Sequence, residues 1–232
     1  MTLSHIELQK IYDEFLEEKI KNGIEKFMEQ NLDEPDYLTD SLWELDFMIG
    51  GIGGYCMPPN PVNNPFPAGI ERELYRPLQY ARSNIDICDV RMQARFVIES
   101  AGMHLEAACR LYLKEKCALG NMRFYNTTLG KAVNKIKQIG EFEANVINAL
   151  QNFVSVYNRS KHEINQDDSR ERLFNAYDAI TVYFTVRVLG LIILKSLGVS
   201  ESFNKYMLCY TNSRYIKKGR RKENLHVPNN QP

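Results

Sequence analysis

The chain has 232 residues, of which 44% are hydrophobic and 25% charged, and these proportions are ordinary for a globular protein that buries one sizeable core. Its 29 basic and 29 acidic side chains cancel, so the overall charge indicates no particular partner. The five cysteines are odd in number and form no CxxC pair, which argues against a disulfide framework and against a zinc knuckle.

The N-terminal region predicts a helical hairpin over residues 1–49. Ser4 and Glu7 have the spacing of a capping box, and apolar residues at helical spacing follow them, so we expect one long amphipathic helix that ends near Asn31. A second helix over Tyr37–Met48 carries the single tryptophan. The first residues lack the basic and apolar regions of a secretory signal, so we expect a cytoplasmic protein with reduced thiols.

Residues 50–69 are rich in glycine, proline and asparagine, which cannot hold a helix or a central strand. The sequence therefore predicts a long Gly/Pro-rich loop. Such a loop fits either a lid over a groove or a plain linker between the hairpin and the main domain. A phosphate-binding loop is excluded, because no Lys-Ser/Thr pair follows the glycines.

From residue 70 to residue 200 the sequence predicts a helical bundle. The predicted helices are one that begins at Ile70, one within Asp86–Lys116, one over Thr127–Ile139, a central helix after Gly140, and a last helix over Ser169–Leu197 with Asp168 as its cap. The helix within Asp86–Lys116 has one apolar stripe that we expect to face the core. It consists of Val97, Ala101, Leu105, Ala108 and Tyr112. Sustained two-residue alternation is absent from the sequence, so the predicted fold is all-α.

The most apolar stretch, Ala179–Leu194, falls short of the roughly 20 residues that a membrane span needs. It also contains Arg187. We therefore expect a buried core helix and no membrane partner.

The strongest candidate for a site is the central helix, where an apolar stripe runs into a polar cluster. The stripe consists of Val146, Leu150, Phe153 and Tyr157. Beyond it, Asn158, Arg159 and His162 are spaced three and four residues apart and can share one helical surface. RNA cleavage without a metal needs a proton-transfer group and a cation near the phosphate. His162 suits the first role, Arg159 or Lys161 the second, and Asn158 could orient either group.

The same residues also have a purely structural interpretation. Arg159 and Glu163 are four residues apart and can form a surface ion pair, while a histidine near a helix end is commonly structural. A metalloenzyme is the third alternative, with His104 and Glu106 as ligands, but the sequence has no Glu-x-x-His pair at ligand spacing. We therefore expect neither a metal nor another cofactor.

The C-terminal tail, residues 201–232, contains a basic run without an acidic residue. The basic side chains that could hold phosphates are Arg214, Lys217, Lys218, Arg220 and Arg221. The alternative is a solvated, partly disordered end, because the final VPNNQP cannot pack.

The segments TLGKAVNKIKQIG and VSVYNRSKHEI, followed by an aromatic-rich closing helix, resemble the HEPN superfamily over roughly Ile70–Gly198. The resemblance implies a bundle of four or more helices that usually dimerises, with the motif helices meeting across the two-fold axis. It also implies a metal-independent endoribonuclease, an activity common among toxins, RNA-processing factors and phage-defence proteins.

The HEPN motif is an Arg, often followed by Asn, then three residues and a His. The Asn falls on Asn158 and the His on His162, but the Arg position falls on Tyr157. Arg159 lies about 200° further round the helix, so it is not a simple substitute. The resemblance implies that Asn158, Arg159 and His162 would be catalytic and that Tyr157, Lys161 and Glu163 would help to bind RNA. The alternative is a non-catalytic dimerisation or scaffold module with a degenerate motif, which holds a protein or RNA partner.

Overall fold

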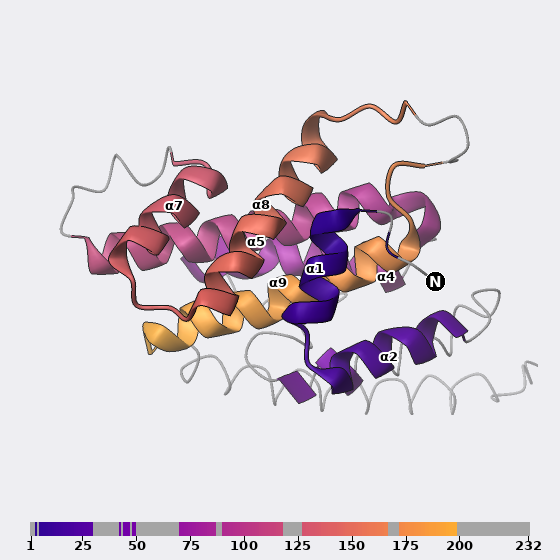
Figure 1. Cartoon of the computed structure of the whole chain (residues 1–232), viewed down its shortest axis with the longest axis horizontal. Helices are drawn as coiled ribbons and strands as arrows, with labels where there is room; N and C mark the ends of the chain where they lie inside the picture. The colour runs from indigo at the N-terminus through magenta and orange to yellow at the C-terminus, as the bar shows by residue number, and fades with distance from the viewer. Residues whose placement is uncertain are drawn as a thin grey trace, which may run out of the picture.

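The computed structural model, shown in Figure 1, describes residues 3, 5–29, 42, 44–46, 48–49, 70–86, 90–117, 127–166 and 172–198. Its helices are α1 (Ile6–Glu14), α2 (Glu18–Glu29), α4 (Ile70–Asp86), α5 (Val90–Lys116), α7 (Leu129–Ile139), α8 (Ala144–His162) and α9 (Ala176–Ser196). Residues 42, 44–46 and 48–49 are also helical. These ranges contain no strand, so the predicted all-α class is confirmed. The predicted loop 50–69 and the basic tail lie outside the described residues.

Helix α5 lies at the centre of the bundle and contacts α4, α7, α8 and α9. Figure 1 shows α5 and α9 running along the long axis of the molecule while α8 crosses them obliquely. The stripe predicted for α5, from Val97 to Tyr112, is fully buried, which confirms that interpretation. Gly102 belongs to the same helix, and a Cβ atom there would lie 2.2 Å from the ring of Tyr157. The small residue therefore allows α8 to pack directly against α5.

Helix α9 is buried on nearly every side. Among the described helices it is the one long and apolar enough to cross a membrane, yet here most of it is covered by other helices. The prediction of a core helix is therefore confirmed. Its predicted start was wrong, because residues 172–175 are not helical and α9 begins at Ala176. Asn175 is the cap, and it exchanges hydrogen bonds of 2.9 and 3.0 Å with Asp178 in a capping box.

The prediction of one long N-terminal helix was wrong, because the structure has two helices there, α1 and α2. The chain leaves helical geometry at Phe15–Glu17, where the amides of Phe15 and Leu16 both donate to the carbonyl of Ile11, at 3.0 and 3.1 Å. The apolar stripe explains this break, since the buried residues of α2 lie roughly 140° round the helix from those of α1. A straight helix could not bury both stripes in one core. The predicted capping box is also wrong, because His5 precedes the first helical residue.

Candidate functional site

The end of α8 is built by an apolar stripe and by a cation from α5. The four predicted stripe residues, Val146 to Tyr157, are all buried. Helix α8 ends at His162, and Glu163 is extended. Arg95 of α5 donates to the carbonyl oxygen of Ser160 and, at 3.4 Å, to that of Glu163. The last carbonyl groups of a helix have no partner within the helix, and a guanidinium group there donates hydrogen bonds to them. Its positive charge also interacts favourably with the negative end of the helix dipole.

Tyr157, which the predicted resemblance aligns with the Arg of the HEPN motif, is only 2% exposed. Its ring packs against Gly102 and stacks on Phe153, with ring centroids 5.9 Å apart. The ammonium group of Lys161 lies 3.8 Å from the ring centroid in a cation–π contact. Burial raises the pKa of the Tyr157 phenol, and nearby carboxylates, including Glu106, raise it further. Tyr157 is therefore a neutral ring fixed in the core.

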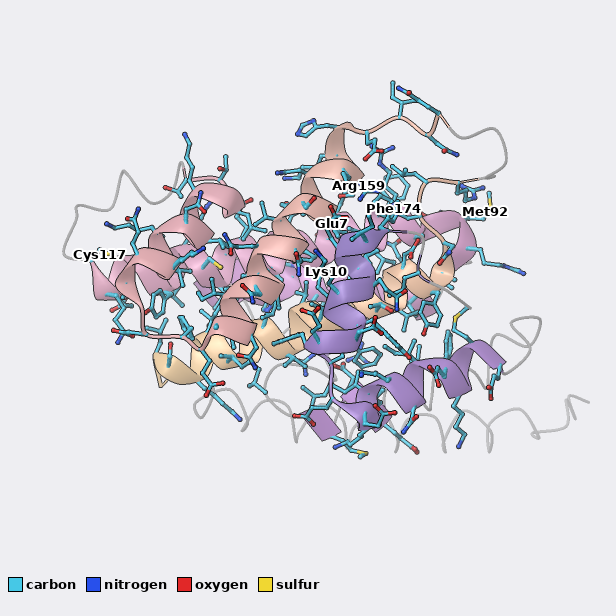
Figure 2. All side chains as sticks on the ribbon, viewed as in Figure 1. Glu7, Lys10, Met92, Cys117, Arg159 and Phe174 are labelled. Atoms are coloured by element: carbon cyan, nitrogen blue, oxygen red, sulfur yellow. The ribbon has the colours of Figure 1, made fainter. Side chains whose placement is uncertain are left out.

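The guanidinium group of Arg159 is held by two carboxylates from different parts of the chain. Its Nη1 donates to Oε2 of Glu7 at 2.8 Å, and its Nε donates to Oε2 of Glu163 at 2.8 Å. Figure 2 shows Arg159 on α8 beside Glu7 on α1. The pair with Glu163 has the spacing that the structural interpretation gave it. The pair with Glu7 was missed, because 152 residues separate the two side chains in the sequence.

His5 also contacts Arg159, from the start of α1. The Nδ1 atom of His5 faces Nη2 of Arg159, and its Nε2 atom lies 2.9 Å from the carbonyl oxygen of Leu173. A neutral ring with its proton on Nε2 satisfies both contacts, because Nε2 donates to the carbonyl and Nδ1 accepts from the guanidinium. The ring also packs on Phe174, with centroids 4.8 Å apart. The histidine that the structure places against Arg159 is therefore His5.

Glu7 has a second partner on α8. The hydroxyl group of Ser155 donates to Oε1 of Glu7 at 3.2 Å. Partial burial raises the pKa of the Glu7 carboxyl, but a hydrogen bond from its own backbone N–H, the Arg159 cation and the Ser155 hydroxyl together hold that pKa below its usual value. Glu7 is therefore a carboxylate at neutral pH, bridged between Ser155 and Arg159.

The remaining candidates of the predicted site lie at the surface. Asn158, Lys161, His162 and Glu163 are exposed. In the part of the chain that the structure describes, the side chains of Asn158 and His162 form neither a hydrogen bond nor an ion pair, with Arg159 or with another residue. The last turn of α8 thus carries an accessible imidazole, amide and ammonium group. The tail candidates, Arg214 to Arg221, lie outside the described residues.

A second polar cluster, which we call the Asp46 network, lies deep in the core. The Asp46 carboxylate is 0% exposed and accepts hydrogen bonds from Nη1 of Arg82 at 3.1 Å, Nε of Arg187 at 2.5 Å and the hydroxyl of Tyr183 at 2.9 Å. These partners come from α4 and α9, so one carboxylate joins two helices and the segment near residue 46. The network is inaccessible to any substrate, and its role is structural.

His104 of α5 is buried close to the Asp46 network. Its Nδ1 atom lies 2.6 Å from the carbonyl oxygen of Leu74, and its Nε2 atom faces Gly190, where an added Cβ would lie 2.4 Å away. Burial lowers the pKa of His104 to about 4, with a further lowering by the Arg187 cation. His104 is therefore neutral at physiological pH. Among the described residues no group of three or more His, Cys, Asp or Glu side chains could hold a metal ion.

Comparison with protein-family models, with curated proteins and with solved structures finds no match to this chain.

Proposed function

We propose that this chain is a HEPN-like helical-bundle protein that binds RNA at the exposed end of α8. The observation that carries the proposal is the accessibility of Asn158, Lys161 and His162 on the last turn of that helix. An ammonium group attracts the phosphate backbone, and amide and imidazole groups donate hydrogen bonds to phosphate and sugar oxygens. The resemblance of the YNRSKH segment to the HEPN motif supports RNA as the partner and a toxin-like or phage-defence setting.

Cleavage of the bound RNA makes a stronger demand on the site than binding does. His162 has the accessibility and the chemical type of a general base or acid for a 2′-hydroxyl. A cation must also face the crowded phosphate, and Arg159 already pairs with Glu7 and Glu163. Lys161 is the remaining cation on this turn. Binding is therefore the activity that the geometry supports better, and metal-independent cleavage through His162 is its extension.

RNA binding is tested with a fluorescein-labelled single-stranded RNA in excess chelator, using wild-type protein and the Lys161→Ala variant. The matched control is Lys114→Ala, which removes an exposed lysine from α5. We expect Lys161→Ala to weaken binding several-fold and to reduce the salt dependence by about one phosphate contact. We expect Lys114→Ala to bind like wild type. Equal affinities for the two variants would contradict the proposed site.

Cleavage is tested in the same chelated mixture with the His162→Ala and Arg159→Ala variants. Products with cyclic phosphate ends that disappear in His162→Ala, even at protein concentrations at which this variant still binds the RNA, would establish a metal-independent ribonuclease. Undiminished cleavage by His162→Ala would remove His162 from the mechanism. RNA binding without any cleavage would identify a binding protein with a degenerate motif.

A non-catalytic dimerisation module is the second candidate, and a specific surface favours it. Met92, Phe96 and Met103 of α5 are 52%, 54% and 53% exposed, and they lie within about 40° of one another around the helix. Ile164, which follows α8, is 77% exposed, and Arg95 ties that end of α8 to α5. Burial of this face against a second copy would bring two α8 ends together.

The oligomeric state tests that candidate directly. Sedimentation of the Phe96→Asp variant should show a monomer if the α5 face joins two copies, because a carboxylate would be buried without a partner. The control, Gln138→Asp, adds the same charge on the exposed side of α7 and should leave the assembly unchanged. A wild-type monomer, or a dimer unaffected by Phe96→Asp, would contradict dimerisation through this face.

A further inference from the structure

Ser155 and Arg159 lie one helical turn apart on α8 and hold a single carboxylate between them. Ser155 donates to one oxygen of Glu7 at 3.2 Å, and Arg159 donates to the other at 2.8 Å. The carboxylate comes from the first turn of α1, so it reaches α8 only through the tertiary fold (Figure 2). The two side chains thus offer one positive charge and two hydrogen-bond donors to the same oxyanion.

A phosphate group offers the same pair of oxygen acceptors as a carboxylate. Guanidinium and hydroxyl groups are common donors to phosphate, and an arginine binds two oxygens at once. We propose that Ser155 and Arg159 form a phosphate-binding site for RNA, which Glu7 occupies in this structure as an internal competitor. The inference rests on the proposed function, because RNA supplies the phosphate, and it adds an anchor for the RNA one to two turns before His162.

Exchange of Glu7 for a phosphate requires movement of one side chain and no unfolding of α1. Leu8 and Ile11 are fully buried, and His5 contacts the carbonyl oxygen of Leu173, so the helix stays anchored without Glu7. The side chains of Glu7 and Arg159 are 30% and 26% exposed, which leaves both open to solvent. Ion pairs with such access to water contribute little to stability, so an external anion can compete for the guanidinium.

The charges around the site are of both signs, and a second carboxylate competes with any external anion for Arg159. Glu163 is a second carboxylate on Arg159, and its side chain is 44% exposed. Lys161 lies two residues after Arg159, about 200° further round the helix, and three residues after the exposed Asn158. A phosphate on Arg159 would therefore lie on the same side of α8 as His162, about 60° away, and RNA that passes round the helix end would bring further phosphates to Lys161. The internal competitor weakens this binding in the wild-type protein without removing it.

The decisive variant is Glu7→Gln, which keeps the size of the side chain and removes its charge. The matched control is Glu14→Gln, because Glu14 is exposed at the end of the same helix and the change in net charge is identical. We expect Glu7→Gln to bind labelled single-stranded RNA about tenfold more tightly than wild type, and Glu14→Gln to stay within about twofold. Adding Arg159→Gln to Glu7→Gln should abolish the gain. Equal affinities for Glu7→Gln and Glu14→Gln would overturn the inference.

An experiment with inorganic phosphate tests the oxyanion site independently of whether RNA is the ligand. Phosphate should raise the Tm of Glu7→Gln more than that of Glu14→Gln, since a ligand that binds the native state stabilises it. Phosphate stabilisation confined to Glu7→Gln, with no RNA bound by any form, would support the oxyanion site and overturn the proposed function. Wild-type RNA binding that depends on Lys161, with no gain and no phosphate effect in Glu7→Gln, would overturn the oxyanion site alone.

Discussion

Two clusters of charged side chains join distant parts of this chain, and they differ in their access to water. In the Asp46 network, Asp46 and Arg187 are 0% and 1% exposed, and Tyr183 donates to the same carboxylate. In the cluster at the end of α8, Arg159 and Glu7 each keep more than a quarter of their side-chain surface in water. Both clusters pair carboxylate with guanidinium groups, and they differ in the exposure of those groups.

Exposure decides whether a charged partner can be exchanged. Removal of one partner in the core leaves a charge without compensation in a medium of low polarity, which costs several kcal/mol. The charged groups of the Asp46 network therefore cannot exchange their partners at low cost. At the end of α8, water screens the charges and can replace a lost partner. Arg159 is therefore suited to binding a ligand, whereas Arg187 is suited to fixing a helix.

The largest expected effect comes from the core. The Asp46→Asn substitution removes the carboxylate charge that Arg82 and Arg187 contact and should lower the free energy of unfolding by about 3–5 kcal/mol. Chemical denaturation measures it. The control is Asp13→Asn on the exposed face of α1, for which we expect a change within about 0.5 kcal/mol. A cost for Asp46→Asn as small as that of the control would show that the Asp46 network contributes no more than a surface pair.

A somewhat smaller effect is expected on acidification, through His104. Its pKa is about 4 in the folded protein and 6.5 when unperturbed, so between these values the unfolded chain binds a proton that the native state does not. The free energy of unfolding should therefore fall by about 3 kcal/mol as the pH drops from 6.5 to 4, and this contribution should level off below pH 4. Denaturation at several pH values measures it.

The comparison that isolates His104 uses two substitutions of the same kind. His104→Asn should lose this part of the pH dependence, since an amide does not titrate in this range. His162→Asn should keep it, because His162 is exposed. Identical pH dependence in wild type and His104→Asn would mean that protonation of the buried imidazole has no part in acid sensitivity.

The smallest effect is expected at Glu7. Glu7→Gln should change the free energy of unfolding by no more than about 1 kcal/mol, and added salt should reduce the change. The folded pKa of Glu7 lies below its ordinary value of 4.5, so the stability that the Glu7 carboxylate contributes is present above pH 4.5 and is lost as the pH falls through the folded pKa. A loss above 2 kcal/mol that persists in high salt would place Glu7 with the committed core charges, and exchange for a phosphate would then be unfavourable.

Helical periodicity predicted most of the buried faces. The stripes from Val146 to Tyr157 and from Val97 to Tyr112 are buried as predicted, because a helix repeats its inward face every three to four residues whatever its neighbours are. The break at Phe15–Glu17 was missed, although the shift of the apolar stripe between Phe15 and Ile20 records it. The start of α9 was misplaced because Asp168 and Asn175 are both good capping residues.

The partners of Arg159 are of two kinds, one that the sequence predicts and others that only the fold brings close. Glu163 is four residues away, so the helix alone brings the two side chains together. Glu7 and His5 lie more than 150 residues away, and no local pattern records their approach. Their contact depends on how α1 packs across α8, which follows from the burial of its apolar face.

By itself, the sequence determined the all-α class, most of the helices and the faces that they bury, since these depend on interactions within a few residues. The tertiary structure alone decided that Tyr157 packs against Gly102, that Asp46 joins α4 to α9, and that Glu7 forms an ion pair with Arg159. These contacts join residues far apart in the chain, and the burial of many apolar side chains at once sets them. For that reason the arrangement of charge around the candidate site could be read only from the folded protein.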